Sequence, residues 1–270
     1  MFATPLSIAA ALPEAVDLRN AMPPVYNQGR IGSCVSNAVA AIVQYVRKKN
    51  RQGPDFVPSR LFLYYNGRVL ENSVASDPGL MLQDAITVAT DLGVCPEAEW
   101  PYDDTPLCDN DDPKTGCAKG QWPASSRNPV RPQKKVYRNA YLYRTIAARP
   151  VPQRLEEMKG CLADGYPFAF GFTIYESFFE SPSTTPPSTA PRKIVPTPTL
   201  SELPVGQHAV VAVGYDDRKK LFICRNSWDV KDSAGREMQD RGHFYMPFDY
   251  LLNSDLSGDF YTIRALTGFR

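Results

Sequence analysis

The sequence predicts an α+β fold in which a mainly helical first half precedes a strand-rich second half. Residues 35–92 contain patterns typical of helices, whereas residues 168–225 contain apolar runs typical of buried strands. The polar stretch 103–132, with several prolines and two cysteines, separates the two halves. At 270 residues the chain is long enough for two lobes that each bury a core. We expect one unit, with a mainly helical lobe over residues 16–132 and a mainly β lobe over residues 133–270.

The composition is that of an ordinary soluble globular protein. Hydrophobic residues make up 43% of the chain and charged residues 22%, unlike a disordered or membrane chain. The net charge of +1 implies no particular partner, and no basic run suggests nucleic acid binding. No apolar stretch approaches the ~18 residues of a membrane span. The six cysteines and two histidines lack metal-ligand spacing, so neither a metal ion nor another cofactor is expected.

The best-defined element is a helix over residues 35–49 with Cys34 in its first turn. Apolar side chains recur at spacings of three and four, and three cations close the helix where its dipole favours them. Gly32 and Ser33 supply a turn and a candidate N-cap. Free backbone N–H groups at a helix start favour a thiolate, so a lowered pKa is expected for Cys34. The alternative is a small buried side chain that happens to begin a helix.

Periodicity and breaker residues predict the other elements of the chain. Gly93 marks the end of the third helix as a C-cap residue, and a proline and a glycine bracket the helix of the second half. In chain order, the predicted elements are helices over 59–70 and 80–92, a strand over 136–146, a helix over 152–164 and a buried strand over 168–175.

A hairpin is predicted from the strand patterns over 209–215 and 221–225. If its turn is centred on Asp217, residues whose numbers sum to 434 face each other, which places His208 opposite Asn226. Opposed residues have Cβ atoms about 5 Å apart, near enough for a side-chain hydrogen bond. An amide in that place orients an imidazole toward a nucleophile. The alternative for His208 is a polar residue at a strand end, and the other histidine, His243, is interpreted as structural.

Three further segments carry open alternatives. Residues 1–15 form an arm whose short apolar run lacks the preceding positive charge of a secretory signal. Residues 181–204, rich in Pro, Ser and Thr, form either a flap at a cleft rim or a mobile surface loop. Cys108 and Cys117 flank an acidic stretch, and the sequence leaves open whether they form a disulfide.

Taken together, these motifs resemble the papain-like cysteine peptidases, particularly their divergent bacterial members. The order Gln, Cys, His, Asn, with six residues from Gln28 to Cys34, is the specific part of the likeness. The matching stretches are Asp17-Leu18-Arg19, Gln28 to Cys34, Gly206 to Val210 with Gly214-Tyr215, Arg225-Asn226-Ser227-Trp228, and Gly242 to Pro247. Weaker similarity extends over most of the chain.

The resemblance implies a role for each of these residues. Cys34 is the expected nucleophile, His208 the general base and acid, and Asn226 the residue that orients the imidazole. Gln28 is the expected side-chain donor to the oxyanion of the tetrahedral intermediate, formed on the way to an acyl-enzyme. Trp228 is expected to shield the bond between Asn226 and His208 from water.

The resemblance also implies a two-lobe architecture, with a helical lobe that carries the cysteine, a β-barrel-like lobe that carries the histidine and asparagine, and a cleft between them. A polypeptide substrate is expected in the cleft, and Gly79 matches the glycine that lets substrate backbone approach closely. Ile31 stands where the family often has a cysteine, so the disulfide there is absent. Val35 stands where the family commonly has a tryptophan, so the shape of the substrate subsites is expected to differ from that of other members.

Two other functions are compatible with the same fold: a catalytically silent binding protein, or an acyl transferase that uses the same triad. The filled catalytic positions and the Asn226-Ser227-Trp228 stretch favour the peptidase. A monomer is expected. Residues 1–15 are expected to cover the cleft as a latency segment, as in a zymogen. The family resemblance favours a secreted or periplasmic protein, although the chain shows no clear signal peptide.

Overall fold

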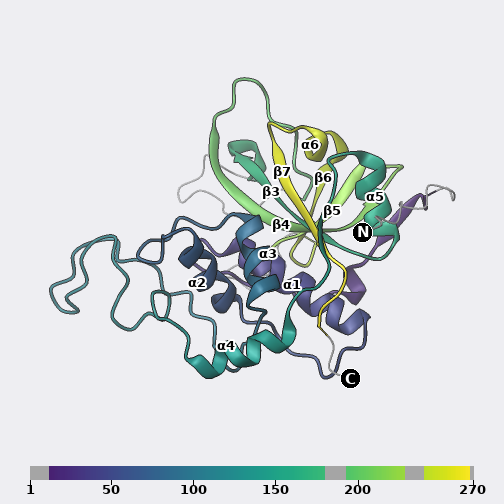
Figure 1. The fold of residues 1–270 in the computed structure, drawn as a ribbon. Coiled ribbons are helices and arrows are strands. Elements are labelled where there is room, and N and C mark those ends of the chain that lie inside the picture. The colour runs from purple at the N-terminus through teal and green to yellow at the C-terminus, as the bar shows by residue number, and fades with distance from the viewer. Residues whose placement is uncertain (1–11, 180–192, 229–239, 268–270) are drawn as a thin grey trace.

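The computed structural model describes residues 12–179, 193–228 and 240–267. The helices that precede residue 141 lie on one side of the molecule, and a twisted antiparallel sheet with the later helices lies on the other (Figure 1). The helices are α1 (Cys34–Lys49), α2 (Arg60–Leu70), α3 (Leu82–Asp91), α4 (Lys134–Ala140), α5 (Leu155–Ala163) and α6 (Phe248–Leu252). The strands are β1 (Ala15–Asp17), β2 (Ala148–Pro150), β3 (Phe168–Tyr175), β4 (Pro204–Asp216), β5 (Leu221–Arg225), β6 (His243–Pro247) and β7 (Ser257–Ile263).

The sheet is organised around β4. Its strand order is β2-β7-β3-β4-β5-β6, and β1 pairs with the C-terminal part of β4. Since successive side chains of a strand point to opposite faces, Val211 and Val213 join the core beneath α1, whereas Val210 and Ala212 join a second core within the sheet lobe. A single strand therefore borders both cores and also carries His208.

The α+β fold class is confirmed, and so are most of the predicted elements. Helices over 59–70 and 80–92 and the strand over 168–175 are present within two residues of their expected bounds. The predicted helix over 152–164 is α5, which begins at Leu155. Among the described residues, none of the helices has both the length and the apolar character to span a membrane.

The strand predicted over 136–146 is wrong. These residues form α4 and a 3₁₀ turn, Tyr141–Tyr143. The interleaved aromatic residues suggested alternation, but the fully buried residues of this helix, Val136 and Ala140, are four apart, which is helical spacing. The end of α4 lies close to the backbone of Gly93. A Cβ on Gly93, which has a φ of +78°, would lie 1.9 Å from the carbonyl oxygen of Ala140. The glycine expected to end α3 therefore also makes room for α4.

The hairpin register predicted around Asp217 is also wrong. Paired residues of β4 and β5 have numbers that sum to 437 near the turn and 436 beyond an irregularity between Ala212 and Gly214. The turn is centred between Arg218 and Lys219 and not on Asp217, and the irregularity adds a one-residue shift. His208 lies beyond the last pair that β4 makes with β5, and it pairs instead with Phe172 of β3.

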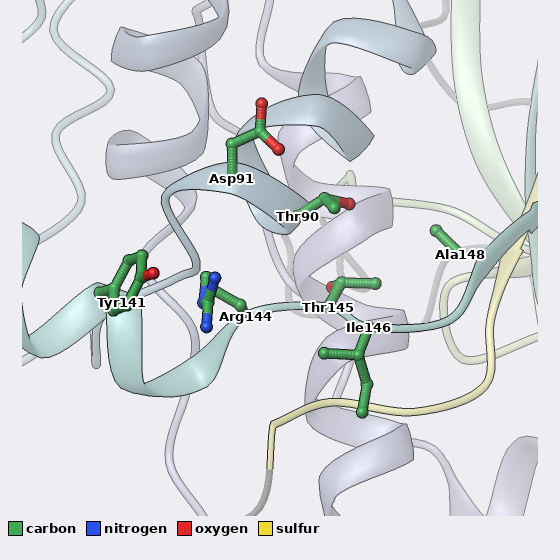
Figure 2. A pocket seen from close by; sticks show the side chains of 7 residues that line it. All are labelled: Thr90, Asp91, Tyr141, Arg144, Thr145, Ile146 and Ala148. Carbon is green, nitrogen blue, oxygen red and sulfur yellow. The ribbon is translucent and has the colours of Figure 1, made fainter.

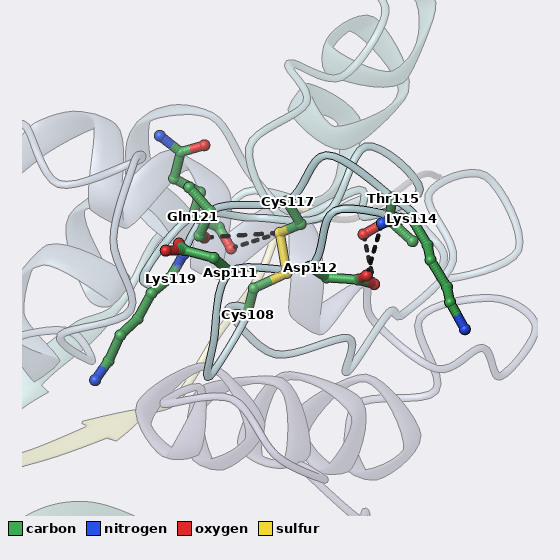
Figure 3. The surroundings of a disulfide bond; sticks show 9 residues. Cys108, Asp111, Asp112, Lys114, Thr115, Cys117, Lys119 and Gln121 are labelled. Carbon is green, nitrogen blue, oxygen red and sulfur yellow. Dashed lines mark hydrogen bonds between the residues drawn. A yellow bond between two sulfur atoms is a disulfide. The ribbon is translucent and has the colours of Figure 1, made fainter.

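Cys108 and Cys117 form a disulfide in the long loop that extends from the helical side (Figure 1), with Cα atoms 6.3 Å apart. Figure 3 shows the acidic loop that it closes, in which Asp112 accepts hydrogen bonds from the Lys114 backbone N–H and the Thr115 hydroxyl. The disulfide left open by the sequence is thus present.

Two predicted segments fall largely outside the described residues. Of the arm 1–15, residues 12–15 are described, and they lie at the end of β4 remote from His208, where Ala15 pairs with Asp216. The proposed latency segment otherwise lies outside the described residues. Of the loop 181–204, residues 193–204 are described, and the Lys193 carbonyl oxygen accepts a hydrogen bond from the backbone N–H of Tyr245 on β6. The part expected as a flap lies outside the described residues.

Candidate active site

Cys34 is the first residue of α1 and lines a cavity of about 410 Å³ where the helices meet the sheet. All six cysteines lie in the described part of the chain, and of the four free ones Cys34 alone is not buried. From the helical side the cavity is lined by Cys34, Val35 and residues 78–82, and from the sheet by residues 171–173, 207–209 and 254–259. The cavity therefore brings together Cys34, Gly79 and His208, three of the residues predicted for the site.

His208 is buried on β4, and its imidazole has a defined partner. Its Nε2 lies 2.8 Å from Oδ1 of Asn226, the residue that follows the end of β5. Trp228 stacks on the imidazole, with ring centroids 4.6 Å apart, and the ring of Phe172 lies edge-on at 5.8 Å. Because Nε2 is occupied, Nδ1 is the ring nitrogen left for a group in the cavity. The predicted contact exists even though the register used to derive it is wrong.

Gln28 lies outside the cavity lining and is anchored by hydrogen bonds to two other residues. Its Nε2 donates to the carbonyl oxygen of Ile31 at 3.1 Å, and its Oε1 accepts a hydrogen bond of 2.8 Å from the hydroxyl of Ser227. The Gln28 backbone N–H donates to the Ser227 carbonyl oxygen, also at 2.8 Å. An amide nitrogen has two protons, so one N–H of Gln28 is left after the bond to Ile31.

Ser227 is a residue that the sequence did not single out. Its hydroxyl orients Gln28, and its backbone N–H donates to Asn226 Oδ1 at 2.9 Å, beside the bond from His208. One residue thus couples the expected oxyanion donor to the residue that orients the imidazole. Its position next to Asn226 was the available signal, but its contact with Gln28 joins residues 199 apart in the chain.

Loss of contact with water opposes a charge on the Cys34 thiol and on the His208 imidazole when each is considered alone. Although Cys34 is partly exposed, desolvation by the surrounding residues raises the pKa of its thiol, and nearby backbone N–H groups of Val35 and Ala209 act in the other direction. Burial likewise lowers the pKa of His208 to about 4, against the opposing effect of the Asn226 bond. The backbone N–H groups at the helix start therefore act in the expected direction, but desolvation has the larger effect on the pKa of Cys34. Transfer of the thiol proton to the imidazole would create two opposite charges, which stabilise each other.

A second cavity, of about 500 Å³, lies at the C-terminal end of α3 (Figure 2). Arg144 lines it and stacks on the ring of Tyr141 at 3.8 Å, and Asp91 and Ile146 are also among its lining residues. This lining has neither a histidine nor a cysteine. Among the described residues, no three His, Cys, Asp or Glu side chains gather to hold a metal ion.

Comparisons with known proteins agree with this geometry. The family described as papain family cysteine protease matches residues 12–246. Xylellain, a cysteine protease from Xylella fastidiosa, is 40% identical with a TM-score of 0.81, over 97% of this chain and 90% of that chain. A peptidase C1-like protein of Acanthamoeba polyphaga mimivirus is 33% identical over 249 residues, which are 89% of this chain and 70% of the relative. Digestive procathepsin L 3 of Tenebrio molitor shares the fold at 17% identity and a TM-score of 0.62, over 93% of this chain and 71% of that chain.

Proposed function

Because this chain belongs to the papain family of cysteine proteases, we propose that Cys34, His208 and Asn226 form a catalytic triad that hydrolyses peptide bonds through an acyl-enzyme. The observation that carries this proposal is the bond between His208 Nε2 and Asn226 Oδ1, made by a histidine that lines the same cavity as Cys34. It orients the ring and leaves Nδ1 for the thiol proton.

In the first half of the reaction, Cys34 Sγ attacks the carbonyl carbon of the peptide bond as its proton passes to His208 Nδ1. The carbonyl oxygen becomes an oxyanion. When the tetrahedral intermediate collapses, the C–N bond breaks and the imidazolium protonates the leaving amine. A thioester on Cys34 remains, and a water molecule, deprotonated by His208, attacks it. The carboxylic acid leaves and the thiol is restored.

In this proposal, two donors stabilise the oxyanion. Cys34 is the first helical residue of α1, so its backbone N–H has no partner within the helix. The second is the remaining N–H of the Gln28 amide, whose orientation is supported by Ser227 and Ile31. Donors held in place before the reaction stabilise the oxyanion without reorganising.

Two further residues have supporting roles in this proposal. The stacked ring of Trp228 lies against His208 and limits the access of water to the Asn226 bond. Gly79 lines the cavity with a φ of +91°, a conformation that side chains other than glycine's rarely adopt. The absence of a side chain at Gly79 leaves room for substrate backbone.

Covalent labelling tests the proposal directly. An epoxysuccinyl inhibitor of thiol proteases should alkylate Cys34 in the folded, proteolytically trimmed protein, and peptide mapping by mass spectrometry should find the adduct on that residue alone. The buried thiols of Cys95, Cys161 and Cys224 serve as internal controls. A protein that remains unlabelled at Cys34 would favour a silent binding protein. Labelling together with amide synthesis from added amines, in place of hydrolysis, would favour an acyl transferase.

The charged residues that line the cavity bear on which substrate side chains it prefers. Asp255 and Asp259 are its charged lining residues within the described chain, and both are exposed. Gly258 pairs with Gly171 on β3, which in turn pairs with Ala209 on β4. Two strand spacings of about 4.8 Å place this wall about 10 Å from the strand that carries the histidine, which is two to three residues of extended substrate.

We therefore expect a preference for a basic substrate side chain two or three residues from the cleaved bond. Its aliphatic stem can lie along Met81 and Leu256 while the charge reaches the carboxylates. For Asp259→Asn and Asp255→Asn, the ratio of kcat/KM for arginine over leucine peptides should fall by about threefold to fivefold each, since exposed ion pairs are weak. Fluorogenic peptides varied at one position measure the ratio.

The control is Asp91→Asn, which removes the same charge outside this cavity. It should leave the ratio unchanged, and 1 M salt should lower the ratio of the unaltered enzyme. Equal ratios in all variants would contradict the charge preference. Continued hydrolysis of the leucine peptide in that case would leave the proposed peptidase function intact.

A further inference from the structure

The carboxylate of Asp77 joins two loops at the edge of the active-site cavity. Its Oδ1 and Oδ2 accept hydrogen bonds of 3.0 and 3.1 Å from the backbone N–H of Gly32, which lies two residues before Cys34. Asp77 itself lies two residues before Gly79, and Cys34 and Gly79 line the same cavity. One side chain therefore connects the start of the cysteine helix to the loop that carries the glycine.

Buried side chains of α2 hold the Asp77 loop. Tyr64 is fully buried and donates its hydroxyl hydrogen bond to Asp77 Oδ1. Arg68, also fully buried, donates to the carbonyl oxygens of Val74 and Ser76 at 3.1 and 3.0 Å. The guanidinium lies 4.1 Å from the centre of the Tyr64 ring. Since buried side chains have few alternative conformations, the carboxylate is presented to Gly32 from a stiff support.

The two loops lie close together at this contact. A Cβ on Gly32 would lie 3.0 Å from the backbone nitrogen of Gly79 and 3.2 Å from Asp77 Oδ1. No disulfide makes the link, because all six cysteines are described and the pair Cys108 and Cys117 forms the one disulfide. The hydrogen bonds of Asp77 take up the backbone N–H that points across the gap.

We propose that Asp77 is a positioning residue of this enzyme, whose carboxylate holds Cys34 and Gly79 at the spacing that peptide cleavage requires. This role rests on the proposed function, in which Cys34 attacks a substrate whose backbone lies against Gly79. A shift of about 1 Å between nucleophile and substrate can cost a hundredfold in rate. Asp77 acts through Gly32 and Gly79 and does not line the cavity itself.

The charge of Asp77 has a second effect, which gives the role a distinctive signature. Its negative charge acts in the same direction as burial and raises the pKa of the Cys34 thiol. The other titratable groups that share the cavity with Cys34 are His208 on β4 and, on the far wall, Asp255 and Asp259. Removing the Asp77 charge while these remain should move thiolate formation to lower pH.

Asp77→Asn and Asp77→Ala separate the two effects. The asparagine oxygen can still accept a hydrogen bond from the Gly32 N–H, so kcat/KM should stay within about threefold of the unaltered enzyme. The rate of Cys34 alkylation by iodoacetamide rises with pH as the thiolate forms, and this acid limb of the pH–rate profile should shift down by about half a pH unit. Alanine removes the acceptor, so kcat/KM should fall by about tenfold to a hundredfold. Asp91→Asn is the matched control and should change neither value.

A purely structural role would lower the thermal unfolding temperature without moving the acid limb. The proposal is overturned if the limb of Asp77→Asn coincides with that of Asp91→Asn, or if Asp77→Ala keeps full kcat/KM. Should the alanine variant fail to fold, the alkylation profile of the asparagine variant decides. Alkylation needs no peptide substrate, so it tests Asp77 independently of peptide cleavage. An unaltered enzyme that shows the acid limb but cleaves no peptide would contradict the proposed peptidase function and not the effect of Asp77 on Cys34.

Discussion

Replacing Cys34 with alanine is expected to reduce peptide hydrolysis by about 10⁴-fold or more, the largest effect of any single substitution in this chain. In the proposed mechanism the thiol supplies the electron pair that forms the acyl-enzyme, and no other cysteine lines the cavity. Hydrolysis of a fluorogenic peptide, with active enzyme titrated by the epoxysuccinyl inhibitor, measures the loss.

The combination with His208→Asn sharpens this test. His208→Asn alone should cost nearly as much as Cys34→Ala, and the double variant little more than either, because groups that act as a unit are not additive. Cys161→Ala removes a buried free thiol from α5, outside the active-site cavity, and should keep the activity. Retention of more than about 1% of the rate by Cys34→Ala would refute the nucleophile assignment.

Replacing Gln28 with alanine is expected to lower kcat by about a hundredfold to a thousandfold, with KM little changed. In the proposed mechanism the lost N–H donates to the oxyanion of the transition state, and removal of one such donor costs about 3 kcal/mol. Because this bond is made mainly to the oxyanion and not to the carbonyl oxygen of the bound substrate, ground-state binding should be nearly unaffected. Steady-state kinetics with a single peptide separate kcat from KM.

Two further variants serve as comparisons for Gln28→Ala, one with a smaller expected effect and one with none. Ser227→Ala removes the hydroxyl that orients Gln28 Oε1 and should lower kcat by about fivefold, the equivalent of one hydrogen bond near 1 kcal/mol. Gln83→Ala changes an exposed glutamine on α3 and should have no effect. If Gln28→Ala raised KM and left kcat unchanged, Gln28 would be a substrate-binding residue and not an oxyanion donor.

The elements that the sequence predicted correctly are those with strong local signals. The cysteine helix has apolar spacing on one side and cations at its end, and the strand over 168–175 is a continuous apolar run. The wrong strand over 136–146 had conflicting local signals, since its aromatic residues suit a strand whereas the buried spacing of Val136 and Ala140 is helical. Burial of that face in the core on the helical side decided the matter, and burial is not visible in a single short segment.

Of the site, the sequence and the family resemblance predicted the residue types and their order, and the structure supplied their connections. His208 and Asn226 were paired by a hairpin register that proved to be in error, yet the hydrogen bond exists, because side chains at a strand end can reach beyond the directly opposed partner. The pKa of Cys34 was expected to be lowered at a helix start, but burial prevails. Desolvation depends on everything that surrounds the sulfur.

The sequence by itself therefore determined that this chain has an α+β fold with a cysteine at the start of its first long helix, since these properties follow from periodicity and capping within about 15 residues. Only the tertiary structure decided what holds that helix start in place. The hydrogen bonds from Ser227 to Gln28 and from Gly32 to Asp77 span 199 and 45 residues of the chain. Such contacts exist once two lobes have packed, and no local preference of the backbone encodes them.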